Sequence, residues 1–250
     1  MIRQEGFLLL HGGSLGRTTF AKRNGIYTAQ QRRTNSKLKR EQGGEYQNVR
    51  ESQSEFGTAS TAGKLLRKAI SKLLDDAKDK GINGRLQKQM RNVLKLDTTS
   101  LPGKRNVTAG DKSLLPGFNF NNNARLRAAF NVKFQTQLNR DSGELIINIP
   151  SFKPIPAIKA PVGTTHYKVV SAGAVVNFEE ITYASEIFQS PLLPWDGIGT
   201  LPISAIHHVP ANSIGTLFLV LGIQFFQVSG QWINMVKLGN ANPLCVVAVG

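Results

Sequence analysis

The sequence predicts an α+β protein, with a basic N-terminal hairpin and helices followed by an all-β, sandwich-like C-terminal domain. Charge is unevenly distributed: residues 1–140 carry 27 Lys or Arg against 10 Asp or Glu, whereas residues 141–250 carry 4 against 6. All 11 prolines lie after residue 100, and proline is excluded from helix interiors but tolerated at strand ends and turns. The spacing of apolar residues also changes, from a helical period to a period of two beyond about residue 130.

The first predicted element is a β-hairpin. Residues 18–23 and 26–29 flank Asn24-Gly25, and Asn-Gly favours a two-residue hairpin turn because a type I′ turn needs positive φ at both central positions. In this register Lys22 lies opposite Tyr27, and Phe20 lies opposite Ala29. The polar, basic stretch that follows forms a loop or a helix that folds only on a partner. Residues 1–44 are therefore interpreted as a basic arm that contains this hairpin.

Residues 45–96 form the predicted helical segment. An apolar stripe with helical spacing contains Leu65, Leu66, Ala69, Ile70, Leu73, Leu74 and Ala77. Gly57 and Gly63 argue against one unbroken helix, and Gly81 can end it. A shorter helix follows, with Leu86, Met90, Val93 and Leu94 on one face.

The apolar stripe is wide, and only one short helix is available nearby to cover it. An uncovered stripe is typical of an interface between chains. We therefore expect a homo-oligomer with Leu65, Leu66, Ile70 and Leu73 at the self-association surface. The alternative is that the stripe belongs to the internal core of the chain.

Residues 97–117 have two Pro, three Gly and no periodicity, so they are predicted to be a linker. Residues 118–250 form the predicted β-sandwich domain. Its first hairpin has apolar residues alternating over 130–138 and back over 145–149. Further strands are predicted at 166–171, 174–178, 204–208, 216–227, 231–235 and 244–249. Short strands separated by turns and lacking a helical pattern indicate a sandwich or a barrel.

Targeting and redox features are sparse. The apolar run at residues 7–10 is shorter than the roughly 7–15 residues of a signal-peptide core, and no run approaches the ~20 residues of a membrane span. The single cysteine, Cys245, rules out an intramolecular disulfide and a multi-Cys zinc site. We expect no membrane association and a cytoplasmic location, or a place within a particle assembled inside the cell.

No pattern of catalytic residues stands out, so we expect a protein that is not an enzyme and needs no cofactor. The Gly-rich run at 12–18 fails the phosphate-loop pattern, because its spacing is short and Arg17 stands in place of Lys. The adjacent His207 and His208 cannot point at one metal from a strand, so no metal site is predicted. No small-molecule substrate is evident, and an enzyme with an unrecognised site remains an alternative.

The basic half is the positive indication of function. Basic side chains can neutralise phosphates, and an exposed aromatic ring can stack on a base. The candidate polyanion-binding residues are Arg17, Lys22, Arg23, Tyr27, Arg32, Arg33, Lys37, Lys39 and Arg40. We expect a structural or assembly protein whose basic part contacts nucleic acid, another polyanion or neighbouring subunits. A second hypothesis that is also non-enzymatic is a discrete, non-specific DNA- or RNA-binding accessory protein.

Two stretches carry a resemblance to a known group. The first stretch begins with residues 13–25, Gly-Ser-Leu-Gly-Arg-Thr-Thr-Phe-Ala-Lys-Arg-Asn-Gly. The second stretch is made of residues 219–227, Leu-Val-Leu-Gly-Ile-Gln-Phe-Phe-Gln, and residues 240–247, Asn-Ala-Asn-Pro-Leu-Cys-Val-Val. Together they resemble a family of uncharacterised proteins from Bacteroidota, in which a Gly-rich basic hairpin precedes helices and a β-rich half. The resemblance implies a two-part architecture and a cytoplasmic origin, and it supplies no catalytic residues.

Overall fold

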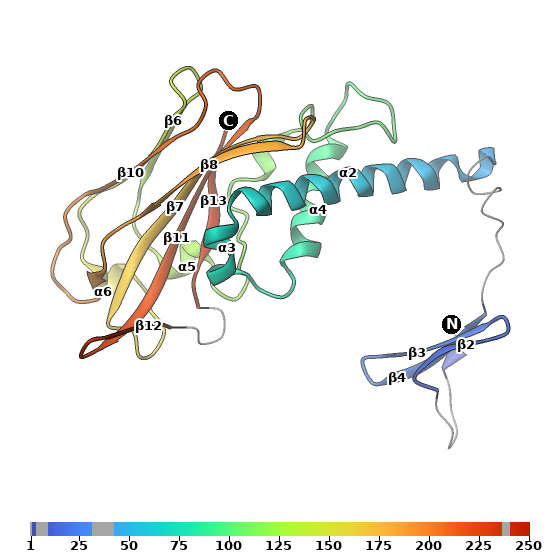
Figure 1. Ribbon diagram of the computed structural model, residues 1–250, viewed down its shortest axis with the longest axis horizontal. Coiled ribbons are helices and arrows are strands. Elements are labelled where there is room, and N and C mark those ends of the chain that lie inside the picture. Colours follow the sequence, from blue (N-terminus) through green and yellow to red (C-terminus); the bar gives the residue numbers. More distant parts are fainter. Residues whose placement is uncertain (1, 4–9, 32–42, 237–240) are drawn as a thin grey trace. The chain divides into compact units, whose positions relative to one another are not determined.

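The protein divides into two compact units, residues 1–50 and 51–250 (Figure 1). The computed structural model describes residues 2–3, 10–31, 43–236 and 241–250. The division falls six residues after the predicted end of the basic arm, because the first turn of a long helix still belongs to the first unit.

The first unit contains a four-stranded antiparallel sheet in the order β1-β4-β3-β2. Its strands are β1 (Ile2–Arg3), β2 (Gly12–Leu15), β3 (Thr18–Arg23) and β4 (Ile26–Gln31). The hairpin register is confirmed, since Lys22 pairs with Tyr27 and Phe20 pairs with Ala29. Asn24 and Gly25 both have positive φ, 50° and 80°, as the predicted turn requires. The strands β1 and β2 were not predicted. A short 3-10 helix, η1 (Gly44–Tyr46), follows.

The helical segment of the second unit forms α2 (Gln47–Ala69), α3 (Ser71–Ala77) and α4 (Ile82–Lys95). The helix α2 continues through Gly57 and Gly63. The helical path breaks instead at Ile70, where φ is −113° and ψ is 18°. The Ile70 carbonyl then accepts hydrogen bonds from the N–H groups of Leu73 and Leu74 at 3.1 and 3.0 Å. The bend keeps the apolar side chains on both sides of it facing the same sheet.

The β-rich half has two antiparallel sheets, as the predicted fold class requires. The larger, six-stranded sheet contains β7 (His166–Asn177), β8 (Thr182–Gln189), β9 (Leu193–Pro194), β11 (Thr216–Ser229), β12 (Trp232–Met235) and β13 (Leu244–Val249). The smaller sheet has the order β10-β6-β5, from β10 (Ile203–His208), β6 (Glu144–Ile149) and β5 (Gln135–Asn139). Short helices η2 (Lys112–Leu114), α5 (Leu126–Ala129) and α6 (Pro154–Ala157) lie in the connections.

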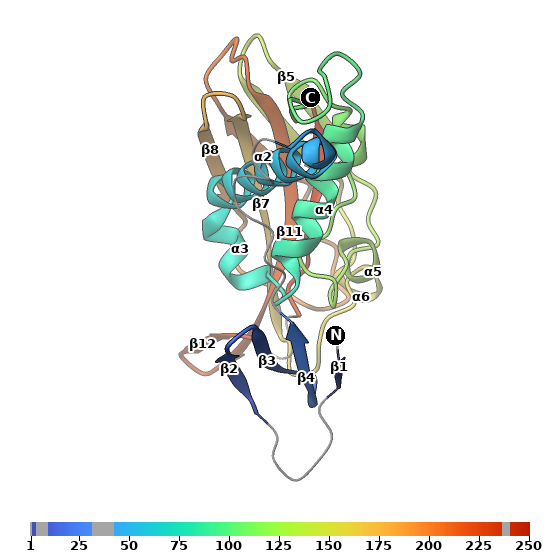
Figure 2. The ribbon, with the colours of Figure 1, turned by 90° about the vertical axis from the view of Figure 1, so that its right-hand side faces the viewer.

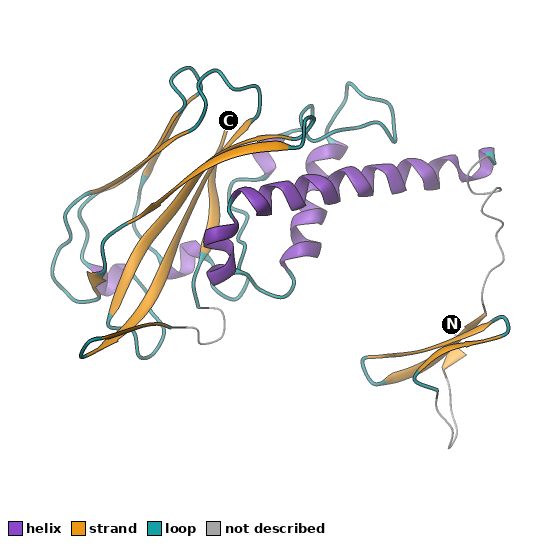
Figure 3. Cartoon of the chain, in the orientation of Figure 1, coloured by secondary structure: helices purple, strands orange, loops and turns teal. Residues whose placement is uncertain are grey.

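The second unit is built in three layers (Figure 1). In Figures 1 and 2, α2, α3 and α4 lie on one side of the strands β7 and β11. Figure 3 shows the long helices gathered on that face, with β6 and β10 on the opposite side of the large sheet. One apolar core lies between the helices and the large sheet, and a second lies between the two sheets.

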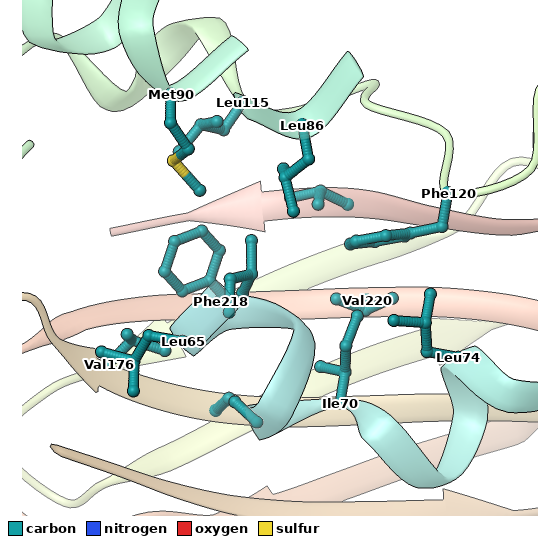
Figure 4. Close-up of a cluster of buried hydrophobic side chains, with 14 of the residues drawn as sticks. Leu65, Ile70, Leu74, Leu86, Met90, Leu115, Phe120, Val176, Phe218 and Val220 are labelled. Carbon is teal, nitrogen blue, oxygen red and sulfur yellow. The ribbon is translucent and has the colours of Figure 1, made fainter. Parts of the chain in front are cut away.

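The helical segment and the β-rich half share one core and are not separate domains. In Figure 4, Leu65, Ile70 and Leu74 face Val176, Phe218 and Val220 of the large sheet, while Leu86 and Met90 approach from α4. The residues predicted for self-association are therefore internal. Leu65, Leu66, Ile70 and Leu73 are 4%, 0%, 0% and 1% exposed. They pack on the sheet of their own chain and offer no surface to a second copy.

Candidate polyanion-binding site

The candidate site is the β3–β4 hairpin of the first unit, where Lys22 and Tyr27 lie directly opposite each other. Side chains alternate between the faces of a sheet, so Phe20, Lys22 and Tyr27 share one face. The Lys22 Nζ is 4.8 Å from the centroid of the Tyr27 ring, a cation–π contact. The ring of His11 meets the same tyrosine edge-on at 5.1 Å. The lysine stays exposed while its position is fixed by the ring.

Arg17 lies apart from this pair, in the turn that joins β2 to β3, and its side chain is exposed. Gly16, the residue before it, has a φ of 57°, a left-handed conformation that costs glycine little. The sequence of the turn thus holds an arginine at the tip of one hairpin, while Lys22 lies near the tip of the other.

The remaining candidates are placed only in part. Arg23 ends β3, and its side chain lies outside what the structure describes. The other five predicted polyanion-binding residues also lie outside the described residues: Arg32, Arg33, Lys37, Lys39 and Arg40. The structure brings together Lys22 and Tyr27 and does not test the rest of the set.

The sheet of the first unit has no buried residue among those described. Leu15 and Ile26 are 75% and 46% exposed, and Phe20 is only half-buried. A sheet needs a packed apolar face for independent stability, and the described residues of this sheet do not form one.

A hydrogen-bonded Ser–His pair, which the sequence analysis did not predict, lies in the second unit. The Ser171 Oγ is 2.9 Å from the His207 Nε2, and both residues are fully buried between the two sheets. Glu186 accepts a hydrogen bond from the backbone N–H of His208 and not from the His207 ring. The hydroxyl is therefore closed off from a substrate, and the pair joins β7 of the large sheet to β10 of the small one.

The inward position of His207 could have been inferred from alternation, because Ala205 on the same strand and Val209 just after it are buried. Its partner could not, because Ser171 lies 36 residues earlier and on another sheet. Burial lowers the pKa of the His207 imidazole below its usual value, since the charged form loses its hydration.

Other chemistry-bearing groups are dispersed. Within the described residues, no three His, Cys, Asp or Glu side chains gather where they could hold a metal ion. Cys245 is buried in β13, and burial raises the pKa of its thiol to about 11. A hollow of about 490 Å³ at one end of the small sheet has Lys133 as its one charged lining residue in the described chain. None of the described helices has the length and apolar character needed to cross a membrane.

Comparisons with protein-family profiles, with curated proteins and with solved structures find no match to this chain. The resemblance noted from residues 13–25 and the C-terminal stretches gains no support from them.

Proposed function

We propose that this protein is a non-enzymatic structural or assembly protein whose basic N-terminal unit contacts nucleic acid. The observation that carries the proposal is the sheet of that unit, which presents Lys22 on the ring of Tyr27 and an exposed Arg17 in the separate β2–β3 turn. Residues 1–44 contain nine Lys or Arg against two Glu. Basic side chains of this kind neutralise phosphates without reading base sequence.

The aromatic ring adds a second kind of contact. Tyr27 is half-buried and lies between Lys22 and His11. Stacking of a base on a tyrosine tolerates any sequence, because every base has a π-face. The proposal places the protein where nucleic acid is available, in the cytoplasm or in a particle assembled there.

A neighbouring subunit is the second candidate partner of the same unit. Leu15 and Ile26 expose apolar surface on the sheet, and such surface favours contact with protein. A basic sheet that docks on acidic groups of a second copy would also cover these residues. The homo-oligomer expected from the sequence would in that case form through the first unit.

The test is salt-dependent binding of the full chain to a random single strand and a random duplex. We expect affinity to fall steeply between low and physiological salt, because each neutralised phosphate releases counterions. The variant R17E/K22E should bind more weakly and show a shallower salt dependence. The matched control is K153E/K159E, which makes the same change of charge at two exposed lysines of the second unit.

Two outcomes would count against nucleic acid as the partner. One is a lack of binding even at low salt, which leaves the subunit contact as the function of the sheet. The other is an equal loss of affinity in both variants, which would assign binding to overall charge. Light scattering without nucleic acid then separates an assembly protein, which forms large species, from a discrete binding module.

A further inference from the structure

A second basic feature lies in the helical layer of the second unit. A hollow of about 530 Å³ is bordered by the last turns of α2, by α3 and by the start of α4. Five cationic side chains line it: Lys64, Arg67, Lys68, Lys78 and Lys80. Two carboxylates, Asp75 and Asp79, also border it. Its size is within the range of small-molecule sites.

The carboxylates of this segment are already engaged. Asp75 pairs with Lys78 at 2.7 Å. Asp79 pairs with Arg85 at 2.5 Å and accepts the N–H groups of Gly81 and Asn122 at 2.8 Å each. Of the lysines that line the hollow, these two carboxylates neutralise Lys78, while Asp79 is engaged by Arg85 outside it.

The nearby Asp76 is committed in the same way. Its Oδ2 accepts a hydrogen bond of 3.1 Å from Gln224 of β11. Its backbone carbonyl accepts another of 3.1 Å from Asn242. This carboxylate is thereby directed toward the large sheet, and it does not border the hollow.

Four cations of the lining therefore have no ion-pair partner among the described residues: Lys64, Arg67, Lys68 and Lys80. Lys64 and Lys68 are four residues apart on α2, a spacing at which like charges destabilise a helix. Arg67 donates only through Nε, to the Gly63 carbonyl at 3.3 Å. Its two terminal nitrogens are left for another acceptor.

Helix-dipole effects explain part of this arrangement but not all of it. Arg67 and Lys68 lie in the last turn of α2, where positive charge is favourable. Lys64 lies before that turn, and Lys80 precedes the opposite end of another helix. The start of α4 also borders the hollow through Ile82 and Asn83, and its N-cap Gly81 supplies no side-chain cap. Amide groups at such a helix start favour an anion.

We propose that this hollow binds phosphate groups, supplied either by a nucleic-acid backbone or by a free polyphosphate. Lysine ammonium groups and the arginine fork would bind the oxygens, and the Asn83 N–H would add a neutral donor, whereas the Ile82 N–H donates to the Asp79 carbonyl at 3.5 Å and reports on the site as its neighbour. The site lies in the second unit and does not depend on the function proposed for the first.

The experiment follows the backbone amides of Ile82 and Asn83 by NMR during titration of the full chain with tripolyphosphate at low salt. We expect saturable shifts at these amides. The variant K68E/K80E should weaken binding roughly ten-fold or more, because it removes two charge-assisted contacts. The control K88E/K95E makes the same charge change at two exposed lysines of α4 outside the hollow and should bind as the wild type does.

A third variant predicts a change in the opposite direction. D75N removes the exposed carboxylate that pairs with Lys78, so it should tighten binding of tripolyphosphate. R17E/K22E, in the first unit, should leave the shifts of Ile82 and Asn83 unchanged. Failure of the hollow and failure of the N-terminal sheet are thus distinguished. Thermal melting of each variant confirms that it is folded.

The outcomes separate the two phosphate sources. Shifts at Ile82 and Asn83 with both tripolyphosphate and a short oligothymidylate identify a backbone-phosphate site. Shifts with tripolyphosphate alone identify a site for a free polyphosphate. The proposal is overturned if neither probe shifts these amides, or if K88E/K95E weakens binding as much as K68E/K80E does.

Discussion

The imidazole of His207 is held in the core between the sheets by one hydrogen bond, to Ser171. Its Nδ1 is buried without a protein partner among the described residues. Burial lowers the pKa of this imidazole in the folded protein, whereas an unfolded histidine titrates near its usual value of about 6.5. As the pH falls below that value, the unfolded state therefore binds more protons than the folded state. The stability that the neutral His207 imidazole contributes at higher pH is then lost.

The variant H207L tests this linkage. Leucine has a similar branched shape but does not titrate, so the decrease in melting temperature between neutral pH and pH 5 should become shallower than in the wild type. At neutral pH the variant should lose about 1–3 kcal/mol, because the Ser171 hydroxyl stays buried without its ring partner. The control is H208L, since the His208 side chain is 70% exposed. Equal slopes in wild type and H207L would contradict the assignment.

Asp97 organises the loop that follows α4. Its Oδ1 accepts the hydroxyl and the N–H of Thr99 at 2.7 and 2.9 Å, and the N–H of Ser100 at 3.0 Å. Its Oδ2 accepts the N–H of Asn106 at 3.1 Å. The hydrogen bond from the Thr99 hydroxyl, with the others, holds the pKa of this carboxyl well below its usual range.

D97N should therefore lower the melting temperature at neutral pH, since an amide has one acceptor oxygen where the carboxylate has two. The stabilising contribution of the wild-type carboxylate is present above its usual pKa and is lost as the pH falls toward the lowered one. The difference between wild type and D97N should thus shrink below about pH 4. D141N is the control, because Asp141 is exposed in the turn between β5 and β6. A constant difference across this range would refute the linkage.

At the scale of elements, β7 shows what the sequence could not reveal. Residues 166–171 and 174–178 were predicted as two strands, but the structure has one strand, His166–Asn177, there. A Cβ at Gly173 would lie 2.5 Å from the Cβ of His207. Position 173 requires glycine because β10 approaches it closely. This contact joins distant segments of the chain, so no local sequence pattern encodes it.

The opposing pair of substitutions G173A and G57A tests this interpretation. G173A should destabilise the protein by about 1–3 kcal/mol, since the added methyl group must displace β10. G57A should stabilise it by up to about 1 kcal/mol, because Gly57 lies in α2 with nothing within 4 Å of an added Cβ. Chemical unfolding of both variants measures the two effects. A neutral G173A would show that the sheets part without cost.

Local sequence patterns predicted the helices and strands that are determined by residues close together in the sequence. The β3–β4 hairpin and its register follow from Asn24-Gly25, and α4 follows from its apolar face. The strand β8 was missed because its side chains are exposed or half-buried on both faces, which leaves no alternation to detect. The role of the stripe around Leu66 depends on the large sheet, about 100 residues away along the chain, so spacing alone could not separate core from interface.

Prediction of the candidate sites from the sequence is limited in the same way, by contacts between distant residues. The sequence predicted the basic hairpin as a group, because Lys22 and Tyr27 are joined by a two-residue turn. It did not predict the hollow in the helical layer, because residues 64–80 contain three Asp among six Lys or Arg, and the sequence does not show which groups those carboxylates pair with. Only the structure shows that Asp76 and Asp79 are engaged by Gln224 and Arg85.

At the scale of the molecule, the two units differ in burial. Every buried side chain in the described residues belongs to the second unit, whereas the first has an open sheet. The helices and both sheets of the second unit enclose its two cores without any residue before Glu51. Folding of the second unit should therefore be independent of the basic arm.

Deletion of residues 1–44 tests this independence. The truncated chain should melt in one cooperative transition, with a midpoint within about 4 °C of the full chain, because no core contact is removed. Among the described residues it loses hydrogen bonds at the start of α2: those to the Gly43 carbonyl from Arg50 at 2.8 Å and from the Tyr46 N–H at 3.1 Å, and that from the Gln47 N–H to the Gly44 carbonyl. Salt-dependent binding to random nucleic acid should weaken in the same protein, whereas tripolyphosphate should still shift the amides of Ile82 and Asn83. Loss of cooperative melting would mean that the first unit completes the core of the second, and the two-unit interpretation would be wrong.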